Sequence, residues 1–517
     1  MYILRLTFQC FALVSLLGAR AAWPQLPPGG GAQQSTRPAQ LPASGRTNQI
    51  GSVETPQSAG GTGINTLNSS VQITGNFSGS IPLTDTSRGA VQLTLADAIK
   101  RGLEANLGAI SANDSVRAAR AQRIQALSAL LPNISANASE TVTQVNLAAY
   151  GFQFKLPASS GFTIPSVVGP FSYSQAQGAL SQSIYDPVQR RNWQAGKETE
   201  RAAMLSAKDA RELVVLAVAG TYLQTVATSA EVTSQRAQVE NAQAVYRQAV
   251  IRKEAGTNAR IDVTRSLVEL QTQQQRLNAL EADLRKQKIT FARIIGLPLD
   301  RDIALIQPLD NAPAAPPDTA AALQRAFQRR SDLLAAEAQV RAAERVLSAA
   351  HAERLPSLSL NGDYGVLGPN PASTHGVFAF TGSVNVPIWE GGRIKGDIQE
   401  AEATLHQRQA ELEDQRARVE QDVRTALIEL DTAMGQVKLA ESNRTYANET
   451  LAEARDRFSA GVSTTVEVVQ AQEQVASAES DYISSLFSLD LAKLNLARAT
   501  GEAEAAGPNL LNGALHD

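Results

Sequence analysis

Two similar stretches of the chain, 205 residues apart, decide its fold. The chain has the sequence AGVSTTVEVVQAQ at residues 460–472 and a weaker copy, AGTNARIDVTRSL, at residues 255–267. In each stretch a glycine, Gly461 or Gly256, follows one long helical pattern and precedes another. Glycine permits the left-handed backbone that ends a helix, and Thr or Ser can cap the next helix. Each stretch therefore predicts a hairpin of two long helices.

The order of elements around these turns also repeats. Asp262 matches Glu467 and Gly296 matches Gly501, again at an offset of 205. Chance rarely aligns several such positions with their flanking patterns, so the chain is predicted to be one helix–strand–strand–helix–helix unit written twice. The first copy is expected to have a helix from Thr94 to Leu131, strands within 134–186 and helices over 187–255 and 262–295; the second is expected to have a helix over 319–355, strands within 358–389 and helices over 392–460 and up to Thr500.

The rest of the chain divides around these two repeats. Residues 1–21 are typical of an export signal, because Arg5 precedes an apolar core that is too short to span a bilayer. Residues 22–90 are rich in Pro, Gly, Ser, Thr, Gln and Asn, which predicts a flexible exported tail. The predicted parts are a signal at 1–21, a tail at 22–90, a first repeat at 91–300, a connector at 301–318, a second repeat at 319–501 and a C-terminal tail at 502–517.

The composition argues against several classes of function. The only cysteine, Cys10, lies inside the predicted signal, so the mature protein is expected to hold no disulfide, thiolate metal site or cysteine nucleophile. The net charge is −3 without a basic run, which argues against a nucleic-acid partner. No nucleophile–base grouping or phosphate loop is present, so we expect no enzyme, no metal and no cofactor. The histidines lack metal-ligand spacing: His351, His375, His406 and His516.

The strand regions have the pattern of membrane strands. Phe378, Phe380 and Val384 share one face, opposite small or polar residues, over about the ten residues that a tilted membrane strand needs. Tyr185 and Trp389 are expected to end their strands, where aromatics of the membrane–water interface lie. The alternative is a two-faced sheet packed on helices. Because four strands are too few to close a membrane barrel, a barrel would need several chains.

The long helices carry packing seams. The helix over 392–460 would be about 100 Å long, and Ile398, Leu405, Leu412 and Val419 repeat along it every seven residues. No segment after the signal has 18 apolar residues in a row, so no membrane-spanning helix is expected. An exported coiled-coil scaffold without a channel would explain these seams. It would not explain the signal, the alternating strands or the duplication.

These features together resemble the TolC-like outer membrane factor family. The resemblance covers residues 91–501 and rests on the two glycine turns, on the start LTLADA at 93–98, on VPIWEGGR at 386–393 and on ARATG at 497–501. It implies a homotrimer that forms a twelve-stranded β-barrel in outer-membrane lipid and a long α-helical barrel through the periplasm. It also implies a passive exit duct for efflux or secretion, with a periplasmic adaptor protein and an inner-membrane pump as partners.

The resemblance assigns roles to residues at the two turns. It implies that Asp262 and Glu467 lie near a periplasmic aperture. Family members with well-described gates carry a second acid where this chain has Gln470, and a basic residue near Ser463, so closure here is expected to depend less on salt links. The turn residues expected to dock the adaptor are Gly256, Thr257, Gly461, Val462 and Ser463.

Overall fold

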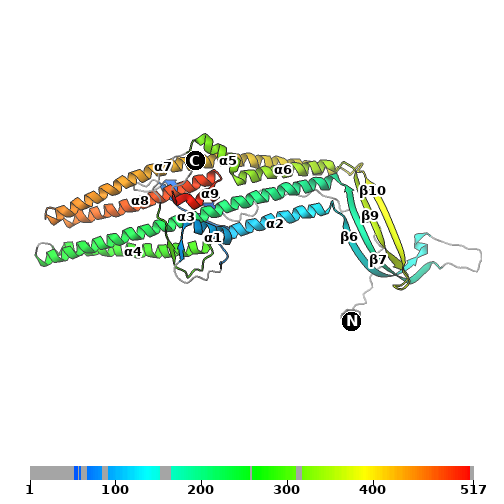
Figure 1. Ribbon diagram of the computed structural model, residues 1–517, viewed down its shortest axis with the longest axis horizontal. Coiled ribbons are helices and arrows are strands. Elements are labelled where there is room, and N and C mark those ends of the chain that lie inside the picture. Colours follow the sequence, from blue (N-terminus) through cyan, green and yellow to red (C-terminus); the bar gives the residue numbers. More distant parts are fainter. Residues whose placement is uncertain are drawn as a thin grey trace, which may run out of the picture. The chain divides into compact units, whose positions relative to one another are not determined.

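The computed structural model describes residues 52–55, 57–59, 67–83, 91–151, 165–256, 259–309 and 317–512; the predicted signal at 1–21 and Thr257 lie outside this part. The duplicated order of elements is confirmed (Figure 1). The first copy contains α1 (Leu95–Ala105), α2 (Leu107–Ser128), β6 (Asn133–Asn146), β7 (Val167–Tyr185), α3 (Pro187–Glu254) and α4 (Arg260–Ile294). The second contains α5 (Thr319–Arg329), α6 (Ser331–Ala352), β9 (Ser357–Gly368), β10 (His375–Asn385), α7 (Arg393–Ser459) and α8 (Thr465–Ala499).

The first helix of each copy is broken, whereas the sequence pattern predicted one continuous helix. Thr94 caps α1 as expected, because its hydroxyl accepts a hydrogen bond from the Asp97 amide at 3.1 Å. The break falls at Asn106, whose side chain caps α2 by accepting from the Gly108 amide at 2.8 Å. Arg330 lies at the matching break between α5 and α6, with an extended backbone. Neither break contains Gly or Pro, so the helical pattern passes over both.

One antiparallel sheet joins the two copies. Its strand order is β10–β9–β7–β6, and the β7–β9 pairing connects the first copy to the second. The apolar residues of the predicted alternation on β10 are exposed, with Phe378 at 73% and Phe380 at 65%. Within the described chain, β6 and β10 each pair on one side only. The sheet therefore has two unpaired edges and an uncovered apolar face.

Tyr185 and Trp389, the two aromatics predicted to lie at the membrane–water interface, differ in their position relative to the ends of their strands. Tyr185 is the last residue of β7, as expected. β10 ends at Asn385, four residues before Trp389, so the prediction that Trp389 ends its strand was wrong. Both side chains are exposed, Tyr185 at 51% and Trp389 at 85%. The apolar alternation runs on past Asn385, which is why the pattern predicted a longer strand.

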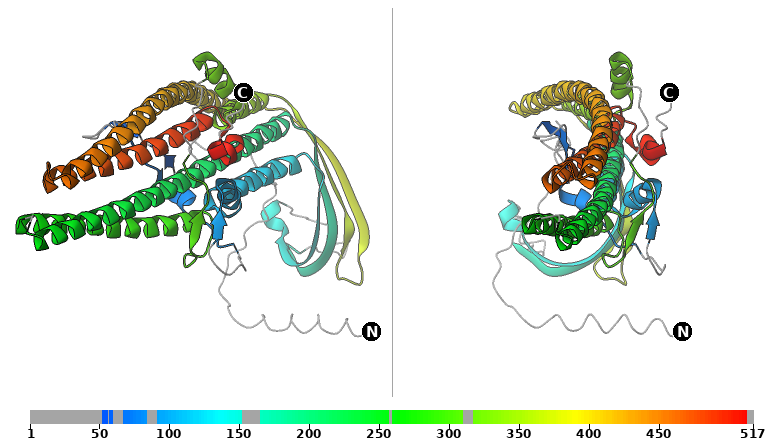
Figure 2. Two further views of the ribbon diagram at one scale, coloured as in Figure 1. Left: turned by 60° about the vertical axis from the view of Figure 1, so that its left-hand side comes forward. Right: turned by 90° about the vertical axis from the view of Figure 1, so that its left-hand side faces the viewer.

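The helices lie along a curved layer, and the sheet curves as well (Figure 2). The 68-residue helix α3 packs against α2, α4, α6 and α8. It contains an 18-residue window with a mean hydropathy of 1.5, of which 78% is buried inside the chain. The sequence criterion of 18 consecutive apolar residues does not detect this window, because polar residues interrupt it. Its burial against neighbouring helices accounts for its composition as that of a core helix.

Residues before the first repeat are part of the folded structure. The short strands β1 (Val53–Glu54) and β4 (Gln72–Ile73) pair, as do β2 (Gln57–Ala59) and β3 (Leu67–Ser69). The Ser69 hydroxyl donates to Ser488 of α8 at 2.9 Å, and the Phe77 ring is 98% buried in the main core. The prediction of a flexible tail over residues 22–90 was therefore wrong for the described residues between 52 and 83. Its apolar residues stand singly among polar ones and give no periodic pattern.

The connector and the C-terminal segment also contain ordered elements. In the connector, β8 (Ile303–Leu305) pairs in parallel with β5 (Val91–Leu93), which tightens the start of the first repeat. After α8, the short helix α9 (Ala503–Ala506) packs on α3 and α8. An ion pair between Arg211 of α3 and Glu504 at 2.5 Å holds it there.

A substitution at Phe77 tests whether the described residues between 52 and 83 stabilise the fold. Its ring packs on Gly108 of α2 so closely that a Cβ atom there would lie 2.4 Å from the ring. Removing a buried aromatic ring costs about 3–5 kcal/mol. We expect Phe77→Ala to lower the thermal unfolding temperature of the purified protein by circular dichroism. Ile81→Ala, at a 52% exposed position, should change it little; equal temperatures for both variants would contradict a structural role for this segment.

Candidate functional site

The two predicted turns have nearly identical backbones. Gly256 and Gly461 have φ angles of +76° and +77°, and each ends its long helix by donating its N–H to a carbonyl three residues earlier. A Cβ atom added at either glycine would have no heavy atom within 4 Å. Val462 is 69% exposed. The turns therefore need glycine for backbone conformation alone, and they present open surface.

Glu467 is held within its own hairpin. The Ser463 hydroxyl donates to Glu467 Oε2 at 2.5 Å, and Arg457 Nε lies 3.7 Å from Glu467 Oε1. The carboxylate also lies in the first turn of α8, where the helix dipole favours negative charge. Sequence reasoning paired Ser463 and Glu467 in one motif but missed Arg457. The two charges are ten residues apart across a turn, a spacing that no helical rule connects.

Asp262 occupies the matching position but has a different environment. It lies in the first turn of α4, with its amide donating to the Ala259 carbonyl at 3.1 Å. Among the residues that the structure describes, its carboxylate has no side-chain partner. Gln470 is exposed on α8, one turn beyond Glu467. The structure thus brings Ser463, Arg457 and Glu467 together, and does not join Asp262 or Gln470 to them.

A contact between the two hairpins lies close to both turns. The Arg252 guanidinium of α3 lies 4.2 Å from the centre of the Phe458 ring of α7, and its Nη2 donates to the Phe458 carbonyl at 3.1 Å. Val245 of α3 joins the same apolar cluster as Phe458 and Val468. Such a contact combines cation–π attraction with a main-chain hydrogen bond. It holds the ends of α3 and α7 at the same height, and sequence reasoning missed it because 206 residues separate the partners.

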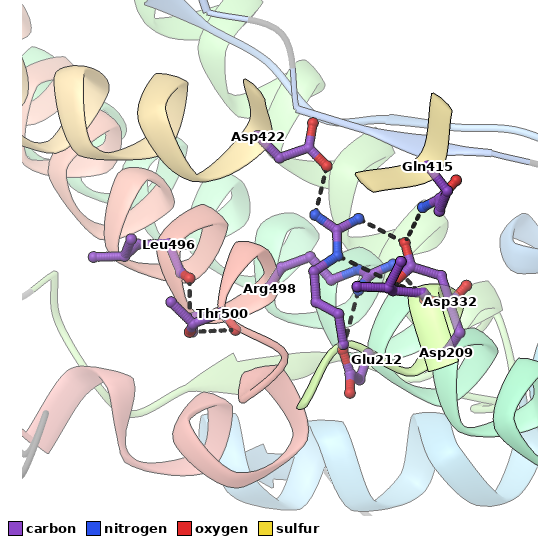
Figure 3. A network of polar contacts seen from close by, with 11 residues as sticks. Asp209, Glu212, Asp332, Gln415, Asp422, Leu496, Arg498 and Thr500 are labelled. Atoms are coloured by element: carbon purple, nitrogen blue, oxygen red, sulfur yellow. Dashed lines mark hydrogen bonds and ion pairs between the residues drawn. The ribbon is translucent and has the colours of Figure 1, made fainter. Parts of the chain in front are cut away.

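A buried polar network ties the helices together away from the turns (Figure 3). Arg330, at the α5–α6 break, contacts Asp332 and Asp422, each at 2.6 Å. Arg498 of α8 contacts Glu212 of α3 at 3.1 Å and also Asp209. Two guanidinium groups therefore face four carboxylates from α3, α6 and α7. Sequence reasoning missed this network, because its members come from both copies.

The excess of carboxylates changes their ionisation. Burial, only partly offset by Arg498 and reinforced by Asp209, raises the pKa of Glu212 to about 7. Burial likewise raises the pKa of Asp209. Burial also acts on Asp332, but its hydrogen bonds with Arg330 and the charge of that group hold its pKa below the ordinary value. Near neutral pH, Glu212 is therefore a carboxyl in this network that exchanges a proton.

The sign of the pH effect follows from the raised pKa. Because the folded state binds the Glu212 proton more tightly than the unfolded state, its contribution to stability is complete below about pH 4 and is lost as pH rises through about 7. Glu212→Gln should imitate the protonated acid. We expect its unfolding temperature to fall less than that of the wild type between pH 5 and pH 8, by a few degrees. Glu240→Gln, at an exposed site on α3, is the control; parallel pH profiles for wild type and Glu212→Gln would contradict the assignment.

Comparisons with known proteins bear on this arrangement. Residues 322–502, which span the second copy, match the sequence profile of the outer membrane efflux protein family. Over these residues the chain is similar to that family. The resemblance inferred from the glycine turns is thereby confirmed. The family's description places its members in the outer membrane and names them as efflux proteins.

Individual relatives are distant. The chain is 25% identical over 303 residues to the pyoverdine export outer membrane protein OpmQ of Pseudomonas putida, which covers 55% of the chain and 61% of the relative. It is 29% identical over 192 residues to the outer membrane protein OprJ of Pseudomonas aeruginosa, which covers 36% of the chain and 40% of the relative. The chain thus spans less than two thirds of these two curated relatives.

A solved structure shares the fold. The outer membrane protein VceC of Vibrio cholerae superposes with a TM-score of 0.66 at 19% identity, covering 79% of the chain and 96% of VceC. The mostly helical architecture with a four-stranded sheet is therefore a fold that the chain shares with VceC.

Proposed function

We propose that this efflux-family chain is one third of a passive outer-membrane exit duct. The observation that carries the proposal is the four-stranded sheet, which has two unpaired edges and an exposed apolar face in the described chain. Inside a bilayer every backbone polar group needs a partner, so a sheet can span only as a closed barrel. Three copies would join β6 of one chain to β10 of the next and give twelve strands.

The helical layer has unpartnered edges on the same two sides. On α4, Ile261, Val268 and Ile289 are at least half exposed at multiples of seven residues. On α7, Leu439 and Tyr446 are 60% and 64% exposed, also seven residues apart. Such stripes are typical of helices that pack on a partner. Because α4 and β6 belong to the first copy and α7 and β10 to the second, one head-to-tail contact would cover both kinds of edge, and such contacts close into rings.

The two glycine turns would form the periplasmic end of this duct. Their open, exposed backbones suit docking of a periplasmic adaptor, which would connect the duct to an energised inner-membrane pump, as in tripartite efflux or type I secretion. The duct itself would carry out no chemistry. An exported coiled-coil scaffold explains the helix stripes but not a sheet whose apolar face and strand edges are both uncovered.

The aperture acids supply the test of this function. Threefold symmetry would bring three Glu467 carboxylates near one axis, where a ring of negative charge attracts cations and repels anions. In planar bilayers the wild-type protein should form cation-selective channels. Glu467→Gln should reduce this selectivity, whereas Arg457→Gln, which removes the cation beside Glu467, should increase it.

Three outcomes would count against these assignments. No conductance from correctly inserted wild-type protein, or its absence from washed outer membranes, would contradict a duct. Conductance with selectivity unchanged in both variants would leave the duct intact and remove Glu467 from the aperture.

A further inference from the structure

A shallow cavity of about 380 Å³ lies where the helices meet the sheet. It opens between the start of α3, which follows β7, and the end of α6, which precedes β9. Its volume is within the range of small-molecule sites. The lining combines charged, polar and apolar side chains and includes Arg191 of α3 together with Glu344, Leu347, Ser348, His351 and Leu355.

The packing of the helices fixes this cavity within one chain. Val188 of α3 packs with Ala349 and Ala352 of α6, which holds the two walls together. α2 packs on the far side of α3, and α7 packs on the far side of α6. The cavity therefore lies between the two middle helices of the layer. Neighbouring copies that cover the edges of the layer in the proposed ring would leave it open.

The helical layer is curved (Figure 2), and the cavity opens on its convex side. On the concave side of a curved layer both neighbouring helices crowd a side chain, whereas the convex side is open. Glu344 and His351 are exposed on one face of α6. Ala335, Ala342 and Val346, on the opposite face at 100° per residue, are buried. The open face of α6 would thus be the outside of the proposed duct.

Two opposite charges in the cavity are not neutralised by the rest of the described chain. Arg191 Nη1 donates to the Pro187 carbonyl at 3.3 Å, which occupies one of the five N–H groups of its guanidinium. Within the described residues, Arg191 has no carboxylate partner and Glu344 has no cationic partner. The cavity therefore offers a cation and an anion to a ligand that carries both charges.

The cavity lies at the depth of lipid headgroups if β7 spans the bilayer. Tyr185 ends β7 with an exposed side chain, as aromatics of the membrane–water interface do. Arg191 follows six residues later, about 9 Å further at 1.5 Å per residue. Helical side chains lean toward the N-terminus, so Arg191 leans back toward the strands. The headgroup layer on each side of a bilayer is about 5–8 Å thick, which Arg191 thus reaches.

We propose that this cavity binds the headgroup of a phospholipid that carries a phosphate and a primary ammonium group. The Arg191 guanidinium donates to the phosphate, an acceptor that its planar fork matches. The Glu344 carboxylate accepts hydrogen bonds from the ammonium. Leu347 and Leu355 pack on the glycerol and on the first carbons of the acyl chains. This proposal rests on the proposed duct and adds to it a lipid of the periplasmic leaflet.

The two charges select this headgroup over other phospholipids. A phosphatidylglycerol headgroup carries the phosphate but offers no cation to Glu344. A phosphatidylcholine headgroup has a cation without N–H groups, so it cannot donate to the carboxylate. The expected order of affinity is phosphatidylethanolamine first, with the other two lipids weaker.

Native mass spectrometry of the full-length protein measures this order. Trimers freed of lipid by extended washing in detergent are titrated with each of the three lipids, and the bound lipids are counted. The wild type should bind up to one phosphatidylethanolamine per chain with the highest affinity of the three. Equal affinity for all three lipids, or no bound lipid, would overturn the proposal.

Variants assign the two charges. Arg191→Gln should weaken phosphatidylethanolamine and phosphatidylglycerol alike, by about tenfold. Glu344→Gln should weaken phosphatidylethanolamine by roughly fivefold and leave phosphatidylglycerol unchanged. Arg190→Gln and Glu402→Gln are the matched controls, because both residues are exposed and lie outside the cavity lining. Equal losses in the controls and in the cavity variants would place the lipid elsewhere on the chain.

A soluble competitor separates a lipid from a free phosphate ester. Glycerophosphoethanolamine has the same headgroup without acyl chains, so it should displace the lipid only at far higher concentration. Competition at equal concentration would assign the cavity to a soluble ligand and overturn the lipid assignment. The same spectra report the duct separately: a wild-type protein without trimers contradicts the proposed function, whereas trimers without selective lipid binding contradict only this site.

Discussion

An unpaired strand edge is the constraint on which the rest of this structure depends. The sheet β10–β9–β7–β6 pairs its inner strands on both sides and leaves the outer sides of β6 and β10 unpaired within the described chain. In water such an edge can be solvated, but in a bilayer each unsatisfied group costs several kcal/mol. In the proposed duct, the exposed apolar face with Phe378 and Phe380 would lie against lipid. The proposed duct meets this constraint by closing the sheet with further copies of the chain.

In the proposed ring, both edges of one chain must keep a fixed distance, so the two copies within the chain must be firmly joined. The β7–β9 pairing joins them in the sheet, the network of Arg330 and Arg498 joins them between helices, and the Arg252–Phe458 contact joins them at the tips. The segment around Phe77 adds packing from outside the repeats. One link lies in the sheet, one between the helices and one at the turns, so the two copies are held together in each part of the described chain.

Much of this fold could be predicted from the sequence because it depends on residues that act on their immediate neighbours in the chain. Gly256 and Gly461 stop helices, Tyr185 ends a strand, and the offset of 205 residues exposes the duplication. What was missed depends on contacts between distant residues. The break at Arg330 has no local marker, and Phe77 gains its role only by packing on Gly108.

The candidate site shows the same division. The motif placed Ser463 and Glu467 together, as the structure has them, whereas Arg457 and Arg252 emerged only from three-dimensional contacts. That α4 and α7 form the two edges of the helical layer likewise emerged only from the packing of the helices.

The number of chains in the assembled particle is the most direct test of this account. Native mass spectrometry of the full-length protein, extracted from outer membranes in mild detergent, measures it without any variant. The account predicts particles of three chains, which supply twelve strands from four per chain. A particle of one or two chains would leave strand edges open and would contradict it.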